Sequence, residues 1–270
     1  VQTALERNRK KYDLQSKQLK GTEKRDKYKV YGELINTYGY NLEPGSKELT
    51  ALNYYTNEEI TIPLDPTQTP GENAQRYFAK YNKQKRTFEA LTELIQETAD
   101  DIQYLESISN ALDIALNEAD LAQIKEELMQ SGYIRRKHTK KKVKLTSKPM
   151  HYISSDGYDM YVGKNNLQNE ELTFSFANGN DWWFHAKGAP GSHVIVKSGG
   201  DELPDRTFEE AGRLAAYYSK NRGADKVEID YIQKKHVKKP NGAKPGFVVY
   251  YTNYSLVIDS DISNIKNVQD

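Results

Sequence analysis

The chain has 270 residues, of which 37% are hydrophobic and 29% are charged, and its net charge is +1. This length is enough for two domains, and the many charges indicate exposed helix surface around a limited core. Cysteine is absent, which excludes disulfides and thiolate metal sites. No run of 18 apolar residues occurs, so we expect no membrane-spanning helix, and no signal peptide is visible.

Charge is distributed unevenly along the chain. Residues 1–133 contain 17 Lys and Arg against 22 Asp and Glu, whereas residues 134–270 contain 22 against 16. The surplus of positive charge lies in the second half, where it would favour contact with a polyanion.

The chain opens with a basic helical pattern over residues 2–38. Its first 30 residues hold ten basic and four acidic side chains, and Gly39 then breaks the pattern. Two short runs of strand-forming residues follow at 49–55 and 58–64. Together they predict a small β insert over 49–64.

A long helix is predicted over residues 71–116, because apolar side chains recur there at heptad spacing for about six heptads. Between residues 89 and 124 there are nine acidic residues and no basic one. The basic helix 2–38 would complement this charge, so we expect an antiparallel coiled-coil hairpin within a monomeric chain. A homodimeric coiled coil is the alternative, although like-charged copies of the acidic helix would repel. The two predicted seams are Ala74, Tyr81, Phe88, Ile95, Ile102 and Leu116, and Tyr77, Leu91, Leu105 and Leu112.

A further helix is predicted over 118–130, with Asn117 at its start and Gly132 just past its end. The next segment, 134–149, contains eight basic residues and no acidic one, and we interpret it as a basic linker between two domains. Its candidate RNA contacts are Arg135, Arg136, Lys137, Lys140, Lys141 and Lys142.

Residues 150–270 predict a compact α+β domain. The fold class is therefore mixed: a long coiled-coil hairpin with a small β insert over 1–133, followed by this α+β domain. One helix is predicted over 208–222, with a capping box formed by Thr207 and Glu210. The expected strands lie at 151–155, 158–163, 172–176, 182–186, 193–197, 227–232, 247–252 and 255–259, the first two joined by a tight turn at Asp156 and Gly157.

The most distinctive stretch is residues 181–194, which read DWWFHAKGAPGSHV. Aromatic side chains on a strand can stack nucleobases at ~1–3 kcal/mol each, and histidines can donate to phosphate or ribose. Strand alternation places Trp182 and Phe184 on one face and Trp183 and His185 on the other. We expect one face to be core, which leaves Trp183 and His185, or their neighbours, as candidates for a ligand. The RNA-facing or structural set comprises His185, Lys187, Ser192 and His193.

Catalysis and metal binding have little support in the sequence. Asp181, His185 and His193 offer three potential ligands, but no second ligand cluster accompanies them. Ser192 adjoins His193, yet adjacent residues do not easily form a Ser–His hydrogen bond, and no nucleophile elbow is present. We therefore expect a protein that is not an enzyme and has no cofactor and no metal.

A second cluster lies at residues 234–246, a segment rich in Pro and Gly with five lysines and no acidic residue. Lysines on such a loop suit contact with phosphates through counterion release. The alternative is a solvated loop that is basic for solubility. The candidate phosphate contacts are Lys234, Lys235, His236, Lys238, Lys239 and Lys244.

Three segments of the chain resemble the NFACT family: residues 62–85, residues 181–194, and residues 234–258, which read KKHVKKPNGAKPGFVVYYTNYSLVI. The first is similar to the start of the family's long middle helix. The other two are similar to signatures of its C-terminal NFACT-R domain. The resemblance implies that the chain corresponds to the C-terminal half of the family, without the NFACT-N domain.

The resemblance also implies a function. Members of the family act in ribosome quality control in the cytoplasm, where they bind the large ribosomal subunit and tRNA and support alanine tailing of stalled nascent chains. Some streptococcal members are named for fibronectin binding, which implies, as the alternative, an adhesin that reaches the cell surface without a signal peptide and binds fibronectin or fibrinogen. RNA binding through lysines weakens steeply with salt, whereas adhesion through apolar or strand contacts would be less sensitive.

Overall fold

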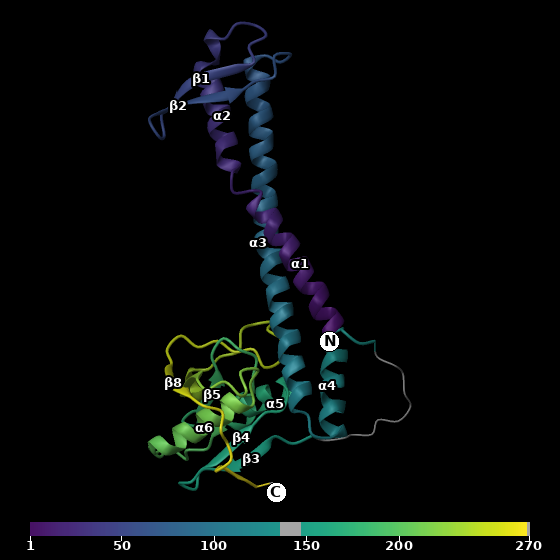
Figure 1. Ribbon diagram of the computed structural model, residues 1–270, viewed down its shortest axis with the longest axis vertical. Helices are drawn as coiled ribbons and strands as arrows, with labels where there is room; N and C mark the ends of the chain where they lie inside the picture. Colours follow the sequence, from purple (N-terminus) through teal and green to yellow (C-terminus); the bar gives the residue numbers. More distant parts are fainter. Residues whose placement is uncertain (136–146, 269–270) are drawn as a thin grey trace. The chain divides into compact units, whose positions relative to one another are not determined.

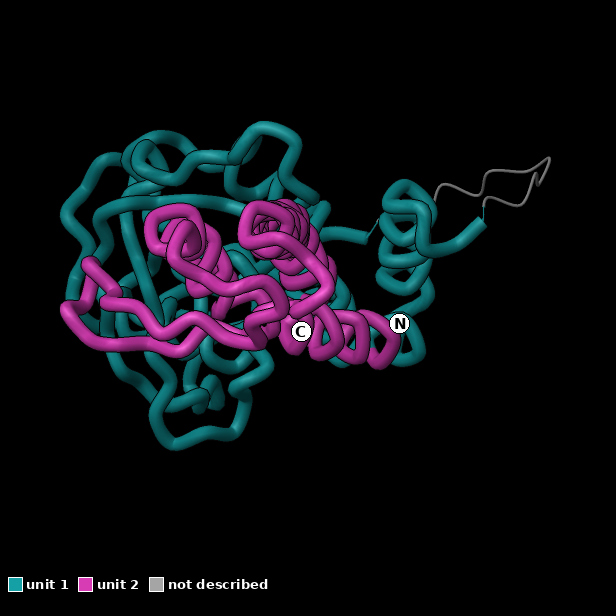
Figure 2. The backbone as a smooth tube through the Cα atoms, turned by 90° about the horizontal axis from the view of Figure 1, so that it is seen from above, with its two compact units in different colours: residues 1–5, 103–270 teal, residues 6–102 magenta. Residues whose placement is uncertain are grey.

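The computed structural model describes residues 1–135 and 147–268, and Figure 1 labels its helices and strands. The chain forms two compact units, which Figure 2 colours separately: unit 1 comprises residues 1–5 and 103–270, and unit 2 comprises residues 6–102. Within the described ranges, no helix has both the length and the apolar character needed to cross a membrane.

The basic start of the chain forms two helices rather than one. Helix α1 (Gln2–Lys20) and helix α2 (Arg25–Tyr38) are separated by a turn. Gly21 weakens the helix at this point, and the hydroxyl of Thr22 donates to the carbonyl three residues earlier over 2.6 Å. Such a side-chain bond competes with the helical hydrogen bond. The prediction of one helix over 2–38 is therefore wrong at this turn.

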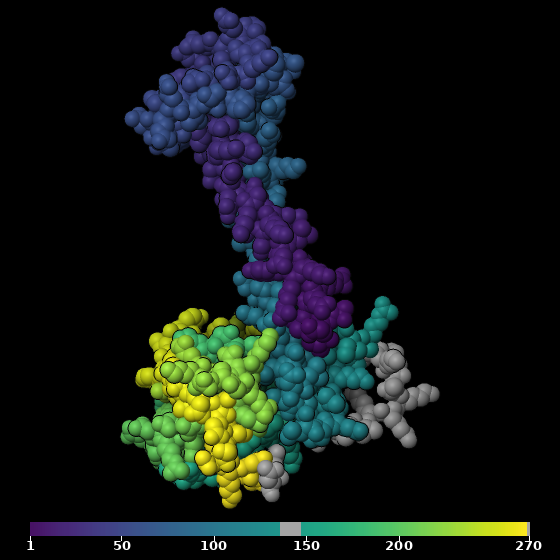
Figure 3. Space-filling view, in the orientation of Figure 1, coloured from purple at the N-terminus to yellow at the C-terminus, as the bar shows by residue number. Residues whose placement is uncertain are grey.

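The predicted β insert is confirmed as an antiparallel hairpin of β1 (Glu48–Asn53) and β2 (Glu58–Pro63). The N–H of Asn57 donates to the Asn53 carbonyl over 2.7 Å, and Asn57 has a φ of 58°, which closes the turn. Figure 3 shows the hairpin, in blue, packed against α2. The core that it shares with α2 and the first turns of the long helix α3 (Pro70–Ile114) contains Leu34, Ile35, Leu49, Ala51, Ile62, Ala74 and Tyr77.

Helix α2 runs antiparallel to the first half of α3. The guanidinium of Arg25, at the start of α2, lies 4.0 Å from the ring centre of Phe88. Further along α2, Gly32 faces Phe78 so closely that a Cβ at Gly32 would stand 2.8 Å from the ring. Residue numbers rise on one helix as they fall on the other, which is the direction predicted for this pair.

The end of α3 packs differently from the prediction. Leu112 and Leu116, assigned to the heptad seams, are 39% and 73% exposed. That assignment is wrong because helix α4 (Glu118–Gln130) folds back and covers another face of α3. The buried side chains on this face are Tyr104, Ile108 and Ala111 of α3 and Ile124 and Leu128 of α4.

Helix α4 begins and ends as predicted. The Asn117 side chain accepts from the Asp120 N–H over 3.1 Å, and Gly132 has a φ of 78° just past the last turn. Phe247 of the sheet domain packs against the α3–α4 core. The boundary between the two compact units lies between residues 102 and 103. The linker predicted from the sequence lies at 134–149.

Unit 1 is built on a seven-stranded antiparallel sheet with the strand order β8-β7-β5-β6-β4-β3-β9. Helix α6 (Asp205–Tyr217) covers one face, and α5 (Asn166–Glu171) leads into η2 (Leu172–Phe176), which packs on the other (Figure 1). The strands are β3 (Met150–Ile153), β4 (Asp159–Val162), β5 (Trp182–Ala186), β6 (Val194–Val196), β7 (Val227–Gln233), β8 (Tyr254–Ile258) and β9 (Lys266–Asn267).

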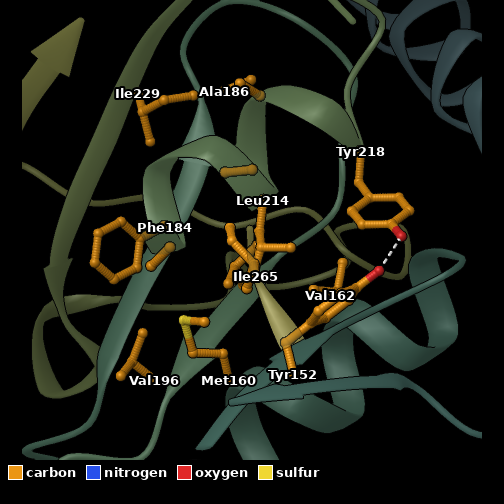
Figure 4. Close-up of a cluster of buried hydrophobic side chains, with 14 of the residues drawn as sticks. Tyr152, Met160, Val162, Phe184, Ala186, Val196, Leu214, Tyr218, Ile229 and Ile265 are labelled. Carbon is orange, nitrogen blue, oxygen red and sulfur yellow. Dashed lines mark hydrogen bonds between the residues drawn. The ribbon is translucent and has the colours of Figure 1, made fainter. Parts of the chain in front are cut away.

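Alternate residues of β5 enter different cores. Phe184 and Ala186 belong to the core beneath α6, which Figure 4 shows together with Leu214. Trp183 lies in the core of the opposite face with Ile195 and is 0% exposed. Both faces of this part of the sheet are therefore covered, and Trp183 is buried rather than exposed on a free face of the sheet.

Three other local predictions in the sheet domain are wrong. Residues 172–176 form the π-helix η2, which continues directly from α5, instead of a strand. Residues 247–252 contribute only an isolated bridge between Val249 and Lys238. The helix expected over 208–222 is α6, which starts and ends earlier than predicted.

The predicted capping box of α6 is not formed. The Thr207 hydroxyl donates to the Asp156 carboxylate over 2.8 Å, and the Glu210 carboxylate accepts from the Ser155 N–H over the same distance. Both side chains tie α6 to the turn between β3 and β4, where Gly157 adopts a φ of 89°. The two polar residues thus serve a tertiary contact, which local spacing does not reveal.

Candidate nucleic-acid interface

The lysine-rich segment 234–246 starts with a 3-10 turn, η3 (Lys234–His236), whose backbone is held by the loop before β5. The Lys234 N–H donates to the Asp181 carbonyl over 2.8 Å, and the Lys235 N–H donates to the Gly179 carbonyl over 3.0 Å. These bonds fix the backbone from which the first lysines project.

The middle of the segment is anchored by a buried valine. Val237 is 5% exposed and lies in the same core as Trp183. Next to it, Lys238 and Val249 exchange two backbone hydrogen bonds of 2.9 and 2.8 Å. The basic side chains around this anchor are exposed: Lys235, His236, Lys238 and Lys239.

The predicted phosphate contacts on this segment differ in their surroundings. The Lys239 ammonium lies 2.7 Å from a Glu170 carboxylate oxygen, and the Lys244 ammonium lies 4.6 Å from the ring centre of Tyr104. Lys234 is half-buried. The exposed groups best placed to meet phosphates are therefore Lys235, His236 and Lys238.

Asp181, at the start of the DWWFH motif, organises the loops around it. Its carboxylate is 1% exposed, accepts from the backbone N–H groups of Asn178 and Ser198 over 2.7 and 3.2 Å, and pairs with Lys197. Across the described part of the chain, no group of three or more His, Cys, Asp or Glu side chains is arranged to hold a metal ion.

His193 and Ser192 are built into the interior. His193 is 2% exposed, and its Nδ1 lies 2.8 Å from the Thr173 hydroxyl. Ser192 is 1% exposed, and its N–H donates to the Tyr218 carbonyl over 3.0 Å. Because both residues are buried, a structural role is favoured for them over direct contact with RNA.

His185 is half-buried, and its ring centre lies 5.4 Å from that of His193. Burial lowers the pKa of His185 to about 4. Burial, reinforced by the neighbouring His185, holds the pKa of His193 well below its usual value. Both imidazoles are neutral near pH 7, so they can act as hydrogen-bonding groups but not as cations.

His185 lines a cavity of about 350 Å³, a volume typical of sites for small ligands. Its walls include the rings of Phe247 and Tyr250, backed by Trp183. The indole Nε1 of Trp183 is buried and has no hydrogen-bond partner among the residues that the structure describes. The cavity thus combines aromatic walls with neutral polar groups and the acidic side chain of Glu106.

The sequence reasoning missed the contribution of α5 to this cavity. Asn166 and Asn169 line it, and the Asn166 amide donates to the Glu127 carboxylate over 2.9 Å. Burial raises the pKa of Glu127. The available signal was the dense run of amide residues over 165–169, because buried amides require specific partners.

The remaining predicted contacts lie elsewhere. Arg135 is exposed. The Lys187 ammonium lies 2.5 Å from a Glu228 carboxylate oxygen, with both side chains 48% exposed. The other linker candidates fall outside the described residues: Arg136, Lys137, Lys140, Lys141 and Lys142.

Two protein-family models match the chain in succession. Residues 1–147 match the NFACT N-terminal and middle domains, and residues 148–251 match the NFACT protein RNA binding domain. The chain belongs to the NFACT family. The lysine-rich segment and the cavity both lie largely within the RNA-binding match, and the resemblance seen in the sequence is confirmed.

Relatives of this NFACT chain carry the name Rqc2 homolog RqcH. The protein from Streptococcus pneumoniae serotype 2 (strain D39 / NCTC 7466) is 42% identical over 270 residues, which is 100% of this chain and 48% of the relative. The protein from Bacillus subtilis (strain 168) is 39% identical over 266 residues, 96% of this chain and 46% of the relative. The NFACT chain thus spans about half the length of these relatives.

A solved structure is also similar to this NFACT chain. It is the C-terminal part of the fibronectin/fibrinogen-binding protein from Streptococcus suis, with a TM-score of 0.75 and 38% sequence identity. The match covers 98% of this chain and 94% of that one.

Proposed function

We propose that this chain is the RNA-binding part of a ribosome quality control factor, which contacts the large ribosomal subunit and tRNA and supports alanine tailing of stalled nascent chains. The observation that carries the proposal is the exposed basic group formed by Lys235, His236 and Lys238. It stands on an anchored backbone within the match to the NFACT RNA binding domain. The relatives named Rqc2 homolog RqcH support the ribosome-related role.

Phosphate contact explains the residue types on this surface. Each lysine that neutralises a phosphate releases condensed counterions, which favours binding without base specificity. The anchored backbone around Val237 reduces the entropy that would be lost on ordering. In this role the ribosome forms the peptide bond, so the protein acts in the cytoplasm as a binding factor, without catalytic residues or a cofactor.

The cavity beside His185 would add a second kind of contact. Single-stranded RNA is commonly recognised by splaying out a base, stacking it on aromatic rings and hydrogen-bonding its edge. The rings of Tyr250 and Phe247 and the neutral imidazole of His185 suit one unstacked nucleobase.

The antiparallel pairing of α2 with α3 supports a helical arm in this factor. We propose that the pairing continues along α1 as an intramolecular coiled coil. Such an arm would leave the protein monomeric and would reach a second contact on the large subunit.

The lysine surface is tested by measuring tRNA binding over a range of salt concentrations. The Lys235→Ala/Lys238→Ala double variant should bind more weakly than wild type, with the salt slope reduced by roughly two, one for each lost phosphate contact. Lys226→Ala/Lys266→Ala removes the same charge from exposed positions outside the segment and serves as the matched control. Equal affinity and slope for the two double variants would refute the role of the lysine surface.

The stacking contact in the cavity can be tested separately from the lysine surface, because stacking involves no counterion release. Tyr250→Leu removes the ring, whereas Tyr250→Phe keeps it. Tyr250→Leu should weaken binding of single-stranded RNA by about 1–3 kcal/mol without changing the salt slope. If Tyr250→Leu bound as tightly as Tyr250→Phe, the nucleobase contact would be wrong.

Adhesion is a second candidate function, favoured by the similarity to the solved fibronectin/fibrinogen-binding protein. Binding of immobilised fibronectin and fibrinogen distinguishes the two. An adhesin should retain both interactions at high salt and in the Lys235→Ala/Lys238→Ala variant, whereas RNA binding should weaken under both conditions.

A further inference from the structure

At the first turn of α6, where Phe208 packs on the sheet, the face that this helix covers carries a row of partly exposed aromatic rings. Tyr231 of β7 pairs in register with Tyr254 of β8, and their ring centres lie 5.5 Å apart. The ring centre of Trp182 on β5 lies 5.9 Å from that of Tyr231. Tyr254 is 62% exposed, and the other two rings are half-buried.

These rings form one side of a groove whose rim is acidic. Asp201, Glu202 and Asp205 line the groove and are exposed, and the buried Leu203 lies between them. No lysine or arginine from the described residues lines it. The groove is therefore negative although the half of the chain that contains it has a surplus of basic residues.

Aromatic rings and carboxylates together select one class of ligand. The face of an aromatic ring attracts an ammonium or guanidinium group, and neighbouring carboxylates add a charge-assisted hydrogen bond. The same carboxylates repel a phosphate backbone, so this groove is unsuited to RNA. An apolar partner would leave three carboxylates desolvated without a partner.

We propose that this aromatic–acidic groove, formed by Trp182, Tyr231, Tyr254, Asp201, Glu202 and Asp205, binds an arginine- or lysine-rich segment of a partner protein. Strand β8 stands at the edge of the sheet, so an extended segment could lie along it and place a cationic side chain over the rings. The proposal is independent of the lysine surface, because the two sites have opposite charge.

The test measures binding of a fluorescein-labelled peptide of six arginines, with a peptide of six citrullines as its neutral counterpart. The wild-type protein should bind the arginine peptide and not the citrulline peptide. Tyr254→Ala should weaken binding about fivefold, as should Asp201→Asn/Glu202→Gln. Both variants change exposed side chains, and their tRNA binding should match wild type.

Glu171→Gln/Asp225→Asn removes two exposed carboxylates that do not line the groove and controls for net charge. The proposal is overturned if this control weakens peptide binding as much as the groove variants, or if Tyr254→Ala has no effect. Equal binding of the citrulline peptide, or no binding of the arginine peptide, would also overturn it. So would self-association that Tyr254→Ala abolishes, because the groove would then be a contact between copies.

Discussion

Asp120 and Lys164 form an ion pair in the interior of unit 1. The Lys164 ammonium lies 2.6 Å from an Asp120 carboxylate oxygen, and the two side chains are 5% and 1% exposed. Although burial opposes ionisation, hydrogen bonds from Lys164 and Ser147 lower the pKa of Asp120. The pair joins α4 to the loop after β4. It therefore connects the part of the chain that matches the NFACT N-terminal and middle domains to the part that matches the RNA binding domain.

Lys164→Met should destabilise the protein strongly, because it leaves the Asp120 carboxylate buried without a cationic partner. We expect a loss of about 3–5 kcal/mol in the free energy of unfolding, measured by urea denaturation. Lys187→Met breaks the exposed pair with Glu228 and should change stability by less than about 1 kcal/mol. Similar losses in the two variants would contradict the structural role of the buried pair.

The histidines beside the cavity should make stability depend on pH. The folded-state pKa of His185 is about 4 against an ordinary value of 6.5, so the unfolded chain takes up a proton first as the pH falls. The stabilisation is complete above pH 6.5 and decreases towards pH 4, by up to about 3 kcal/mol. The difference in the free energy of unfolding between wild type and His185→Gln should therefore decrease as the pH is lowered through this range. Urea denaturation at several pH values measures this difference. A difference that stays constant from pH 7 to pH 4.5 would show that the prediction is wrong.

Gly32 should not tolerate a side chain, because a Cβ there would meet the Phe78 ring at 2.8 Å. Gly32→Ala is expected to cost about 1–3 kcal/mol through overpacking, seen as a lower midpoint in thermal unfolding. Adding Phe78→Leu should restore part of the loss. Gly71 lies in the first turn of α3 with open space around it, so Gly71→Ala should leave stability unchanged or raise it by up to about 1 kcal/mol. Equal effects at the two glycines would refute the close contact.

Leu91 and Leu94 test which face of α3 is buried in unit 2. Leu91 is 7% exposed, whereas Leu94 is 40% exposed. Leu91→Asp places a charge in a buried position and should reduce helical content and the unfolding midpoint in circular dichroism, at a cost of several kcal/mol. Leu94→Asp is the matched control and should have a small effect. The assignment of the seam fails if Leu94→Asp is the more damaging change.

Local sequence signals predicted much of the secondary structure. The ends of α4 follow from Asn117 and Gly132, since a helix cap and a stop glycine act within a few residues. The strand 182–186 was predicted with its observed limits because its run of aromatic residues favours an extended chain. The long helix α3 was predicted from its apolar spacing. That spacing did not reveal that α4 covers the end of α3.

The site was predictable in composition but not in accessibility. Lys235 and Lys238 were identified from charge alone, and they are exposed. The engagement of Lys239 by Glu170 joins residues 69 positions apart, which no local pattern indicates. The burial of Trp183 depends on the second layer over the sheet, which no local pattern indicates.

The sequence by itself determined the family, the direction in which α2 and α3 pair, and the placement of basic residues in the second half, because these depend on short motifs, helical periodicity and counted charge. Only the tertiary structure decided that both faces of β5 are covered, that His185 borders a cavity, and that Trp182, Tyr231 and Tyr254 share a groove. Those relationships depend on strand order, β8-β7-β5, which brings together segments far apart in the chain. Strand order is set by which apolar faces bury each other, a property of the whole domain rather than of any one segment.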